Sequence, residues 1–398
     1  MTQLRPSPLS AGIIVLLMIA VGVNLRPPLS SLGPMLDQIQ AHTGLSGRNV
    51  SLLTTLPIAL MGMGAFFAAY IRRILGEYIG ILMGLSLIGL AFAQRYYGHN
   101  ASGLMSSAVF AGIGISIAQT LLPSFIKHHS REDMGRMMGI YTTIIMGGAA
   151  LGGFLTPIYA QIMAWNHALA AWILLTLAAL VLWGVIARIT HEPARGFRPL
   201  PGPRLGAPGS LWRSPKAYLL GVFMGIGTGS FIILMAWLPA FYTHLGWSPL
   251  KAGALLGALT LAEVFSGLFI SSFITHFPDR RVLIFAALIS LGLGLAAMLI
   301  APLALAWPAG ILMGFGVGGL FPLSVILIMD HAHSPDEAAR LNSFVQGWGY
   351  IIAALFPLFA GIIRDLTGDL HLAWIALGGI TLLEAVITFY AARPHMRT

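Results

Sequence analysis

The stretch Asn24-Leu25-Arg26-Pro27-Pro28 places one arginine and two prolines inside a long run of apolar residues. The flanking segments, 9–23 and 29–39, would together span roughly 46 Å as one helix, more than the ~30 Å hydrocarbon core of a bilayer requires. Arg26 then lies near mid-depth, where a charge costs at least ~2.5 kcal/mol. We therefore expect a water-filled cavity and an anionic substrate to compensate this charge.

Composition places the chain in a membrane. Of its 398 residues, 57% are hydrophobic and only 9% are charged, whereas soluble domains carry roughly 25% charged residues. A net charge of +9 would suggest nucleic acid as a partner of a soluble protein, but here the placement of the charges in loops explains it better. The absence of cysteine excludes disulfides, thiolate catalysis and Cys-ligated metals. No small-residue cleavage site follows the N-terminal segment, so we expect an uncleaved first helix.

Apolar segments long enough to cross a bilayer recur twelve times, which predicts an all-α membrane protein with twelve transmembrane helices. The expected spans are 9–39, 49–71, 76–96, 103–126, 134–162, 168–189, 216–243, 249–276, 281–301, 306–330, 338–364 and 371–392. Residues 190–215 are rich in Pro, Gly and Arg and predict a solvated linker. The predicted organisation is an N-terminal six-helix bundle (1–189), a cytoplasmic linker (190–215) and a C-terminal six-helix bundle (216–398).

The Lys and Arg residues indicate an orientation. If both termini and the linker are cytoplasmic, seventeen of the 22 Lys and Arg residues fall on the cytoplasmic side. The outer side holds only Arg48, Arg95, Lys251 and Arg364, and Arg26 remains inside the membrane. This asymmetry follows the positive-inside rule, so we expect a multi-pass protein of the cytoplasmic (inner) membrane with cytoplasmic N- and C-termini.

The two halves of the chain repeat several features about two hundred residues apart. The corresponding stretches are Gly44-Leu45-Ser46 with Gly246-Trp247-Ser248, Gly112-x-Gly114 and Pro123 with Gly314-x-Gly316 and Pro322, and Arg136 and Pro157 with Arg340 and Pro357. Parallel repeats of this kind predict two pseudo-symmetric bundles that rock about a site at their interface. The pairs Gly148/Gly152 and Gly314/Gly318, each four residues apart, predict close helix packing.

Four stretches carry a resemblance to a known family. They are Val23-Asn24-Leu25-Arg26-Pro27 with Gly33-Pro34, Ala236-Trp237-Leu238-Pro239-Ala240-Phe241-Tyr242, Gly318-Gly319-Leu320-Phe321-Pro322-Leu323 with Asp330-His331, and Gln346-Gly347. The chain resembles the major facilitator superfamily and, within it, the cyanate permease and 2-nitroimidazole transporter family, more closely the cyanate-permease branch. The resemblance runs through nearly the whole chain. It implies the twelve-helix major facilitator fold, alternating access and a small anionic substrate.

Two features depart from the superfamily pattern. The loop Arg72-Arg73-Ile74-Leu75-Gly76-Glu77 lacks the usual Asp, whereas Asp279-Arg280-Arg281 in the second half fits the gating loop better. We expect Asp330 to pair with Arg280, Arg281 or Arg340 as a cytoplasmic gate, or else to be an ordinary helix-end charge. Gly152-Gly153 followed by Thr156-Pro157 differs from the Gly-Pro-x-x-Gly-Gly of proton-driven drug exporters, which disfavours that class.

Arg26 is the strongest candidate for substrate binding, because its planar guanidinium suits a small anion. The alternative is a shorter first helix, from which Arg26 reaches the outer interface. Asn24 is expected either to orient the chain or to touch substrate, and Pro27 and Pro28 to break or bend the helix. Glu263 is a candidate for proton coupling, for pairing with Arg26, or for a protonated group in packing.

Further polar and aromatic residues are candidates for lining the cavity, and we expect about half of them to face it. They are Gln119, Tyr141, Thr142, Trp237, Tyr242, Gln346, Trp348 and Tyr350. Each alone is better explained by packing or interhelical hydrogen bonding than by contact with a ligand. Glu384 is expected to be structural. The pairs His128/His129 and His331/His333 lack further ligands, so no metal is expected. No phosphate-binding glycine loop with its Lys is present, so neither an ATP-driven mechanism nor a cofactor is expected.

These observations favour a secondary active transporter that moves a small anion such as cyanate by alternating access, with Glu263 as the candidate for proton coupling. The expected partners are the anion and the lipid bilayer, without nucleic acid, and the expected state is a monomer. One alternative is an exporter of nitroimidazole-like or other small aromatic compounds, with Trp and Tyr as a stacking surface. A membrane receptor or enzyme is disfavoured, because no soluble domain or catalytic constellation is evident.

Overall fold

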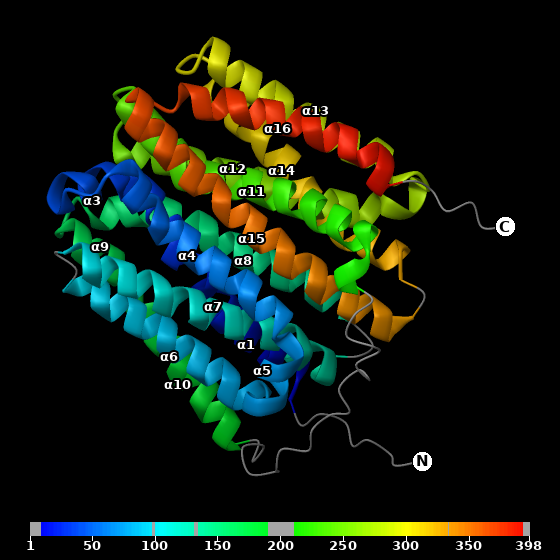
Figure 1. The fold of residues 1–398 in the computed structure, drawn as a ribbon. Coiled ribbons are helices and arrows are strands. Elements are labelled where there is room, and N and C mark those ends of the chain that lie inside the picture. Colours follow the sequence, from blue (N-terminus) through cyan, green and yellow to red (C-terminus); the bar gives the residue numbers. More distant parts are fainter. Residues whose placement is uncertain (1–8, 98–99, 131–133, 190–210, 333, 393–398) are drawn as a thin grey trace, which may run out of the picture.

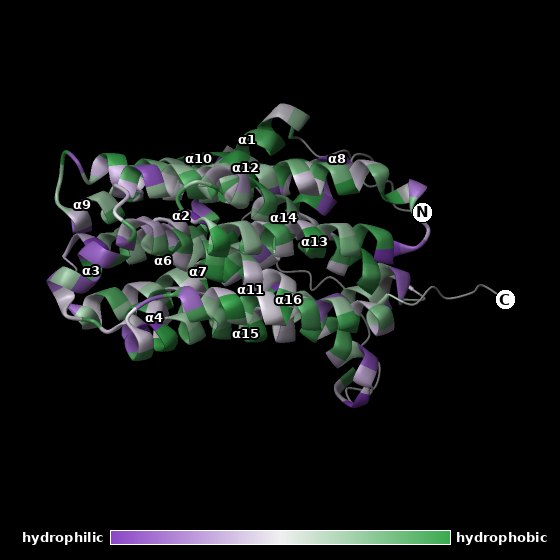
Figure 2. Cartoon of the chain, turned by 90° about the horizontal axis from the view of Figure 1, so that it is seen from above, coloured by the Kyte–Doolittle hydropathy of each residue, from purple (hydrophilic) through white to green (hydrophobic). Residues whose placement is uncertain are grey.

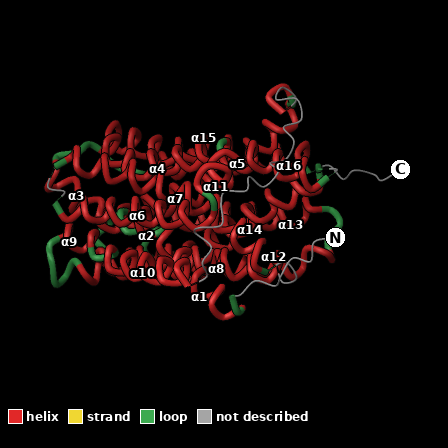
Figure 3. The backbone as a smooth tube through the Cα atoms, turned by 90° about the horizontal axis from the view of Figure 1, so that it is seen from below, coloured by secondary structure: helices red, strands yellow, loops and turns green. Residues whose placement is uncertain are grey.

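The computed structural model describes residues 9–97, 100–130, 134–189, 211–332 and 334–392. Within these ranges the chain is helical without strands (Figure 3), and twelve helical segments are long and apolar enough to cross a membrane. The elements are α1 (Ala11–Gly22), η1 (Val23–Leu25), α2 (Pro27–Ser30), η2 (Gly33–Met35), α3 (Leu36–Thr43), α4 (Gly47–Phe66), α5 (Ala68–Leu75), α6 (Glu77–Tyr96), α7 (Ala101–His129), α8 (Met134–Tyr159), α9 (Trp165–Ala170), α10 (Ile173–Ile189), η4 (Leu211–Arg213), α11 (Pro215–His244), α12 (Pro249–Phe273), η5 (Ile274–His276), α13 (Arg280–Ile300), α14 (Ala306–Asp330), α15 (Pro335–Thr367) and α16 (His371–Ala391). The prediction of twelve spanning helices is confirmed. Most of the predicted linker, residues 190–210, lies outside the described residues.

The helices run along one common axis and form two bundles, α1–α10 and α11–α16 (Figure 1). The beginning of α1 and the end of α16 lie at one end of this axis, which we call the terminus end, and α3 and α9 lie at the opposite end, which we call the far end (Figure 2). Hydrophobic residues cover much of the helices between the two ends, while many of the hydrophilic residues gather near the ends (Figure 2). This distribution is the one that a lipid bilayer imposes on a bundle of spanning helices.

The predicted second span, 49–71, ends earlier than expected. The helix α4 ends at Phe66, and the separate helix α5 begins at Ala68. The last turn of α5 carries Arg72 and Arg73, and none of its residues is buried. Because two adjacent arginines favour an interfacial position over the hydrocarbon core, the chain turns out of the span before it reaches them.

The first span is broken where the sequence places its arginine and prolines. The helix α1 ends at Gly22, and the short helices η1, α2 and η2 follow before α3. Pro27 and Pro28 have no N–H groups with which to continue the α1 ladder. Arg26, between η1 and α2, has φ −110° and ψ −32°, and its carbonyl accepts from the amides of Leu29 and Ser30, both at 2.9 Å. The predicted break is thus present, with Arg26 at its centre.

The two halves use the same turn chemistry at the far end. Gly44 follows α3 with φ +67°, and Gly246 lies just after α11 with φ +90°, in the left-handed region that favours glycine. Two residues later, the Ser46 hydroxyl accepts the Asn49 amide and caps α4, and the Ser248 hydroxyl caps α12 in the same way. This shared geometry is the structural form of the predicted repeat.

Two seams join the bundles, α4 with α15 and α8 with α12. Glycines line both seams, and a Cβ on Gly47, Gly62 or Gly253 would meet the backbone of the opposite helix. A Cβ on Gly62 would stand 2.8 Å from the carbonyl oxygen of Gly347, and one on Gly47 would stand 2.7 Å from that of Gly361. The predicted glycine pairs also pack backbone to backbone, since a Cβ on Gly148 would stand 2.5 Å from the carbonyl oxygen of Val23. Small residues therefore set the helix spacing in the fold.

Candidate functional site

Arg26 is buried at the break of the first span, with 8% of its surface exposed. Its Nε is buried and has no hydrogen-bond partner in the part of the chain that the structure describes. The segment that holds it packs on α8 of its own bundle and on α11 and α12 of the other. A buried guanidinium that keeps an unused donor is costly, which makes Arg26 a suitable partner for an anion.

Glu263, in α12, provides a carboxylate from the opposite bundle. It is 8% exposed, and its Oε2 is buried without a partner among the described residues. Glu263 and Arg26 interact electrostatically, yet the ion pairs found within 4.0 Å in the described ranges do not include them. The two bundles therefore bring groups that can carry opposite charges near each other, without an ion pair within 4.0 Å among the described residues.

Three further candidates lie at this interface. The Nε2 of Gln119 in α7 donates to the hydroxyl of Tyr350 in α15, at 2.9 Å, and so connects the two bundles. Tyr141 in α8 interacts electrostatically with both Tyr350 and Arg26. The Tyr141 hydroxyl and the Gln119 Oε1 are buried and unpartnered within the described ranges. The interface brings together the guanidinium of Arg26, the phenols of Tyr141 and Tyr350, the amide of Gln119 and the carboxylate of Glu263. This set is rich in hydrogen-bond donors.

Gln346 and Trp348 lie on α15, where an aromatic cluster crosses the seam with α4. The Nε2 of Gln346 donates to Asn342 at 3.3 Å. The indole ring of Trp348 lies 6.0 Å from the ring of Phe66 in α4 and 6.2 Å from that of Trp212 in η4. Its Nε1 is buried without a partner in the described part of the chain. This cluster offers an aromatic surface beside the bundle interface.

The remaining lining candidates are engaged elsewhere. The amide of Asn24 donates to the carbonyl of Ala20 and accepts from the Thr176 hydroxyl, both at 2.7 Å, so it ties the first span to α10 of its own bundle. Thr142 is exposed and donates to a backbone carbonyl four residues earlier.

Two aromatic candidates lie within the second bundle. Trp237 is fully buried in α11, and its Nε1 donates to the carbonyl of Pro357 at 3.0 Å. Tyr242 packs against Trp247, with ring centroids 4.6 Å apart, and its buried hydroxyl has no partner among the residues that the structure describes. Both side chains support the packing of this bundle.

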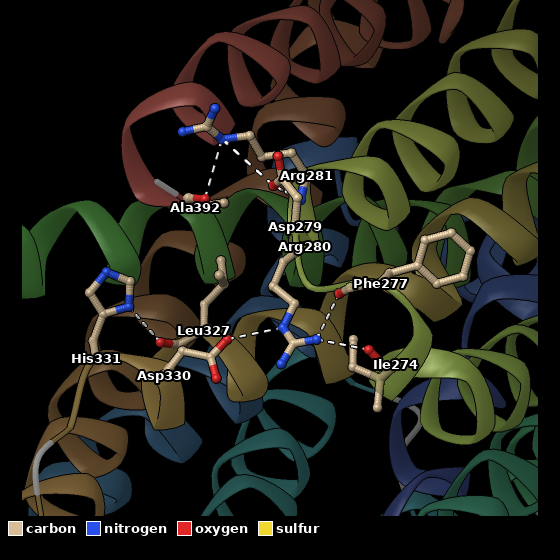
Figure 4. A network of polar contacts seen from close by, with 9 residues as sticks. All are labelled: Ile274, Phe277, Asp279, Arg280, Arg281, Leu327, Asp330, His331 and Ala392. Atoms are coloured by element: carbon tan, nitrogen blue, oxygen red, sulfur yellow. Dashed lines mark hydrogen bonds and ion pairs between the residues drawn. The ribbon is translucent and has the colours of Figure 1, made fainter. Parts of the chain in front are cut away.

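The predicted gate residues form a network inside the second bundle (Figure 4). Arg280 donates to Asp330 at 3.1 Å and to two backbone carbonyls at the end of α12 and η5. Asp279 caps α13, and Arg281 donates to the carbonyl of Ala392 after α16. Arg340 is half-buried in the first turns of α15. Among the described residues, the contacts of Asp279, Arg280, Arg281 and Asp330 join elements of the second bundle and do not cross to the first.

A polar network at the far end, which the sequence did not reveal, does cross between the bundles. Arg364 in α15 donates to Asp37 at 2.8 Å and to Gln40 at 2.9 Å, both in α3. Asp37 also accepts from the hydroxyl of Thr243 in α11. Asp365 accepts the first amides of α4, from Gly47 at 2.6 Å and from Arg48 at 2.8 Å. We call Asp37, Gln40, Thr243, Arg364 and Asp365 the far-end latch. The sequence indicated this contact only in that Asp37 and Arg364 lie near span ends on the same side of the membrane.

Arg95 makes a second contact that the sequence analysis did not predict. Its side chain turns inward from the last turn of α6 and is only 1% exposed. Its Nη2 donates to the carbonyl of Pro28 at 2.6 Å, directly beside the break that holds Arg26. The sequence carried no signal for this contact, because a proline indicates a missing N–H donor and not the partner of its own carbonyl.

One group of metal-ligand type forms at the terminus end. The ligand atoms of Glu77, His128 and His129 lie within 4.8 Å of one another, so Glu77 supplies the third group that the sequence analysis did not find. Glu77 and His128 approach to 3.6 Å, and the Tyr78 hydroxyl lies 3.3 Å from Nε2 of His129. The ion pair and the hydrogen bond account for this grouping without an ion.

The fold and the polar interface define a membrane carrier built from two six-helix halves. The chain belongs to the Major Facilitator Superfamily, whose family model matches residues 12–357. It is 33% identical to the cyanate transport protein CynX of Escherichia coli (strain K12), over 96% of this chain and 98% of that protein. It is 29% identical to the 2-nitroimidazole transporter of the same organism, over 97% of this chain and 95% of that protein. Among solved structures, a D-xylose–proton symporter matches with a TM-score of 0.73 at 14% identity, over 96% of this chain and 98% of that one. These relatives are transporters, so the chain is a membrane transporter and not an enzyme.

Proposed function

We propose that this transporter moves a small monovalent anion such as cyanate across the cytoplasmic membrane, with Arg26 as the counter-charge. The observation that carries the proposal is the buried Arg26 guanidinium at the bundle interface, whose Nε has no partner among the described residues. Tyr141, Tyr350 and Gln119 add neutral hydrogen-bond groups near it, which suits an anion with several acceptor atoms. The similarity to a cyanate transport protein supports the same substrate class.

The proposed mechanism is alternating access between the two bundles, with the terminus end in the cytoplasm as the positive-inside asymmetry favours. In this orientation the far-end latch lies on the outer side and holds the bundles together there. The network of Arg280 and Asp330 stays within one bundle, so the latch is the better candidate for a gate contact. The proposed transporter works as a monomer, since a single chain supplies both bundles and the site residues between them.

Glu263 is the proposed proton-coupling residue. Its carboxylate lies on the opposite bundle from Arg26 and interacts with it electrostatically, without an ion pair among the described residues. Protonation of Glu263 removes the negative charge that competes with an anion for Arg26. Proton and anion then occupy the interface together, which is the requirement for symport.

Uptake of labelled cyanate into proteoliposomes tests this proposal. We expect Arg26→Ala to abolish uptake, Arg26→Lys to retain a small part, and Glu263→Gln to retain binding while losing the response to a pH gradient. Arg48→Ala, which removes an exposed arginine at the far end, is the matched control and should transport normally. Undiminished uptake by Arg26→Ala would remove the proposed mechanism.

The second candidate function is the export of small aromatic compounds such as nitroimidazoles. The aromatic cluster of Trp348, Phe66 and Trp212, with the free indole N–H of Trp348, favours it. The 29% identity to a 2-nitroimidazole transporter supports the same class. Efflux of a neutral nitroimidazole that survives Arg26→Ala but fails in Trp348→Ala would favour this function over anion transport.

A further inference from the structure

Arg95 is a buried cation to which the proposed transport mechanism assigns no role. It lies in the last turn of α6, with 1% of its surface exposed, and its side chain reaches the broken segment of the first span. It donates through Nη2 to the carbonyl of Pro28 at 2.6 Å, and through Nη1 to the Ser31 hydroxyl at 3.4 Å. Its Nε donates to Ser107 in α7, also at 3.4 Å. One side chain therefore connects α6, α7 and the break.

The carbonyl of Pro28 needs a donor from outside its own helix. In a regular helix it would accept from the amide of Leu32, but that amide donates instead to Leu29, at 3.2 Å. An unpaired carbonyl at this depth costs several kcal/mol, because the bilayer supplies no water. Arg95 provides the missing donor at the shortest distance that it makes. The neighbouring Ser31 hydroxyl donates back to Pro27 at 2.6 Å, so the segment is held from both sides.

Arg95 keeps its positive charge without a carboxylate. The ion pairs of the described residues do not include it. Carbonyl dipoles at the C-terminus of α6 favour a cation there, and the guanidinium carbon lies 5.5 Å from the ring centroid of Phe92. The structure thus places a second buried arginine beside the segment that begins at Arg26, and hydrogen bonds, helix dipoles and the Phe92 ring stabilise its charge there.

We propose that Arg95 is a positioning residue for anion recognition: it fixes the segment from Arg26 to Ser31, so that the Arg26 guanidinium faces the bundle interface. This inference rests on the proposed function, because it assigns to Arg26 the role of substrate counter-charge. Arg95 acts through the backbone of the break and does not touch the substrate. Lysine is a poor replacement, since one ammonium group cannot reproduce the three separate donor directions of the guanidinium.

The experiment measures cyanate uptake and cyanate-induced thermal stabilisation of the purified full chain. Arg95→Met and Arg95→Lys are compared with Ser106→Ala, a neighbouring hydroxyl that bonds to Gln94 and Gly103 and not to Arg95. We expect Arg95→Met to raise the KM about tenfold and Arg95→Lys to raise it less, as the loss of a charged hydrogen bond predicts. Ser106→Ala should keep the KM of the parent. A merely structural role would lower the melting temperature and the amount of protein without changing the KM.

The outcomes of these measurements separate this inference from the proposed function. An unchanged KM in both single Arg95 variants would overturn the inference while the proposed function stands. If Arg95→Met does not fold, the KM of Arg95→Lys decides. A raised KM supports the inference, and an unchanged KM overturns it. Absence of cyanate-induced stabilisation in the parent protein would instead overturn the proposed function.

Discussion

The far-end latch allows a direct prediction about the conformation of the two bundles. In Asp37→Asn the side chain loses its charge but keeps its size, so the bond with Arg364 loses its ionic character. A hydrogen bond to a charged group contributes about 1.5–3 kcal/mol when buried, and Asp37 is 40% exposed in this pair, so we discount its contribution to about 1–2 kcal/mol. That energy changes the ratio of far-end-closed to far-end-open molecules about 5- to 30-fold.

The assay uses spin labels at one position in each bundle. The chain contains no cysteine, so Ala41→Cys in α3 and Leu366→Cys in α15 can be labelled without removing others, and both sites are exposed. Pulsed dipolar spectroscopy should show a larger long-distance population in Asp37→Asn than in the labelled parent. Asp369→Asn, another aspartate at the far end, is the control, because Asp369 bonds to His371 of its own bundle.

The swap of Asp37→Arg with Arg364→Asp refines this test. The exchanged pair restores the attraction between α3 and α15, and it should recover much of the short-distance population. Distance distributions that are identical in the parent and in Asp37→Asn would refute the assignment of the latch as a conformational contact. A swap that leaves the bundles as far apart as either single variant would show that other contacts dominate.

Three further predictions concern stability and gating. Gly148→Ala should destabilise the protein by about 1–3 kcal/mol, since its Cβ would clash with the backbone of the first span. The control Gly147→Ala places its Cβ in open space and should leave the stability unchanged. Thermal unfolding in detergent compares the two variants. Trp237→Phe removes the donor to a buried carbonyl in α15, and it should lower stability by about 1–2 kcal/mol with little effect on the substrate KM. Asp330→Asn breaks a partly exposed ion pair within one bundle, so it should lower the free energy of unfolding by less than about 1 kcal/mol. The spin-label distances between the bundles should stay unchanged. Altered distances would support the predicted role of Asp330 as a gate.

Much of the fold follows from patterns that are local in sequence. Long apolar segments predicted the twelve spans, and the paired turns at Gly44 and Gly246 showed the repeat, because a left-handed turn followed by a serine cap has a sequence signature. The break at Arg26 was predictable for a similar reason, since proline removes the donor that a helix requires.

The parts of the site that escaped prediction depend on tertiary contacts. Arg95 lies within one turn of a helix end, where the sequence cannot distinguish a side chain at the membrane surface from one that turns inward to Pro28. Asp37 and Arg364 are 327 residues apart, and only the packing of the two bundles brings them together. Asp330 was expected to pair with one of three arginines, but no sequence pattern indicated that its contact with Arg280 would remain inside one bundle.

The glycine seams have a consequence for the way in which the bundles move. Where Gly47 faces Gly361, Gly62 faces Gly347 and Gly153 faces Gly253, main chain approaches main chain, and side chains such as Phe66 and Leu256 pack beside these contacts. A rotation at the glycines themselves changes few rotamers, so these contacts set little preference for either orientation. The balance between inward- and outward-facing carriers is then set by the far-end latch, by the aromatic side chains beside the α4–α15 seam and by the occupant of the centre.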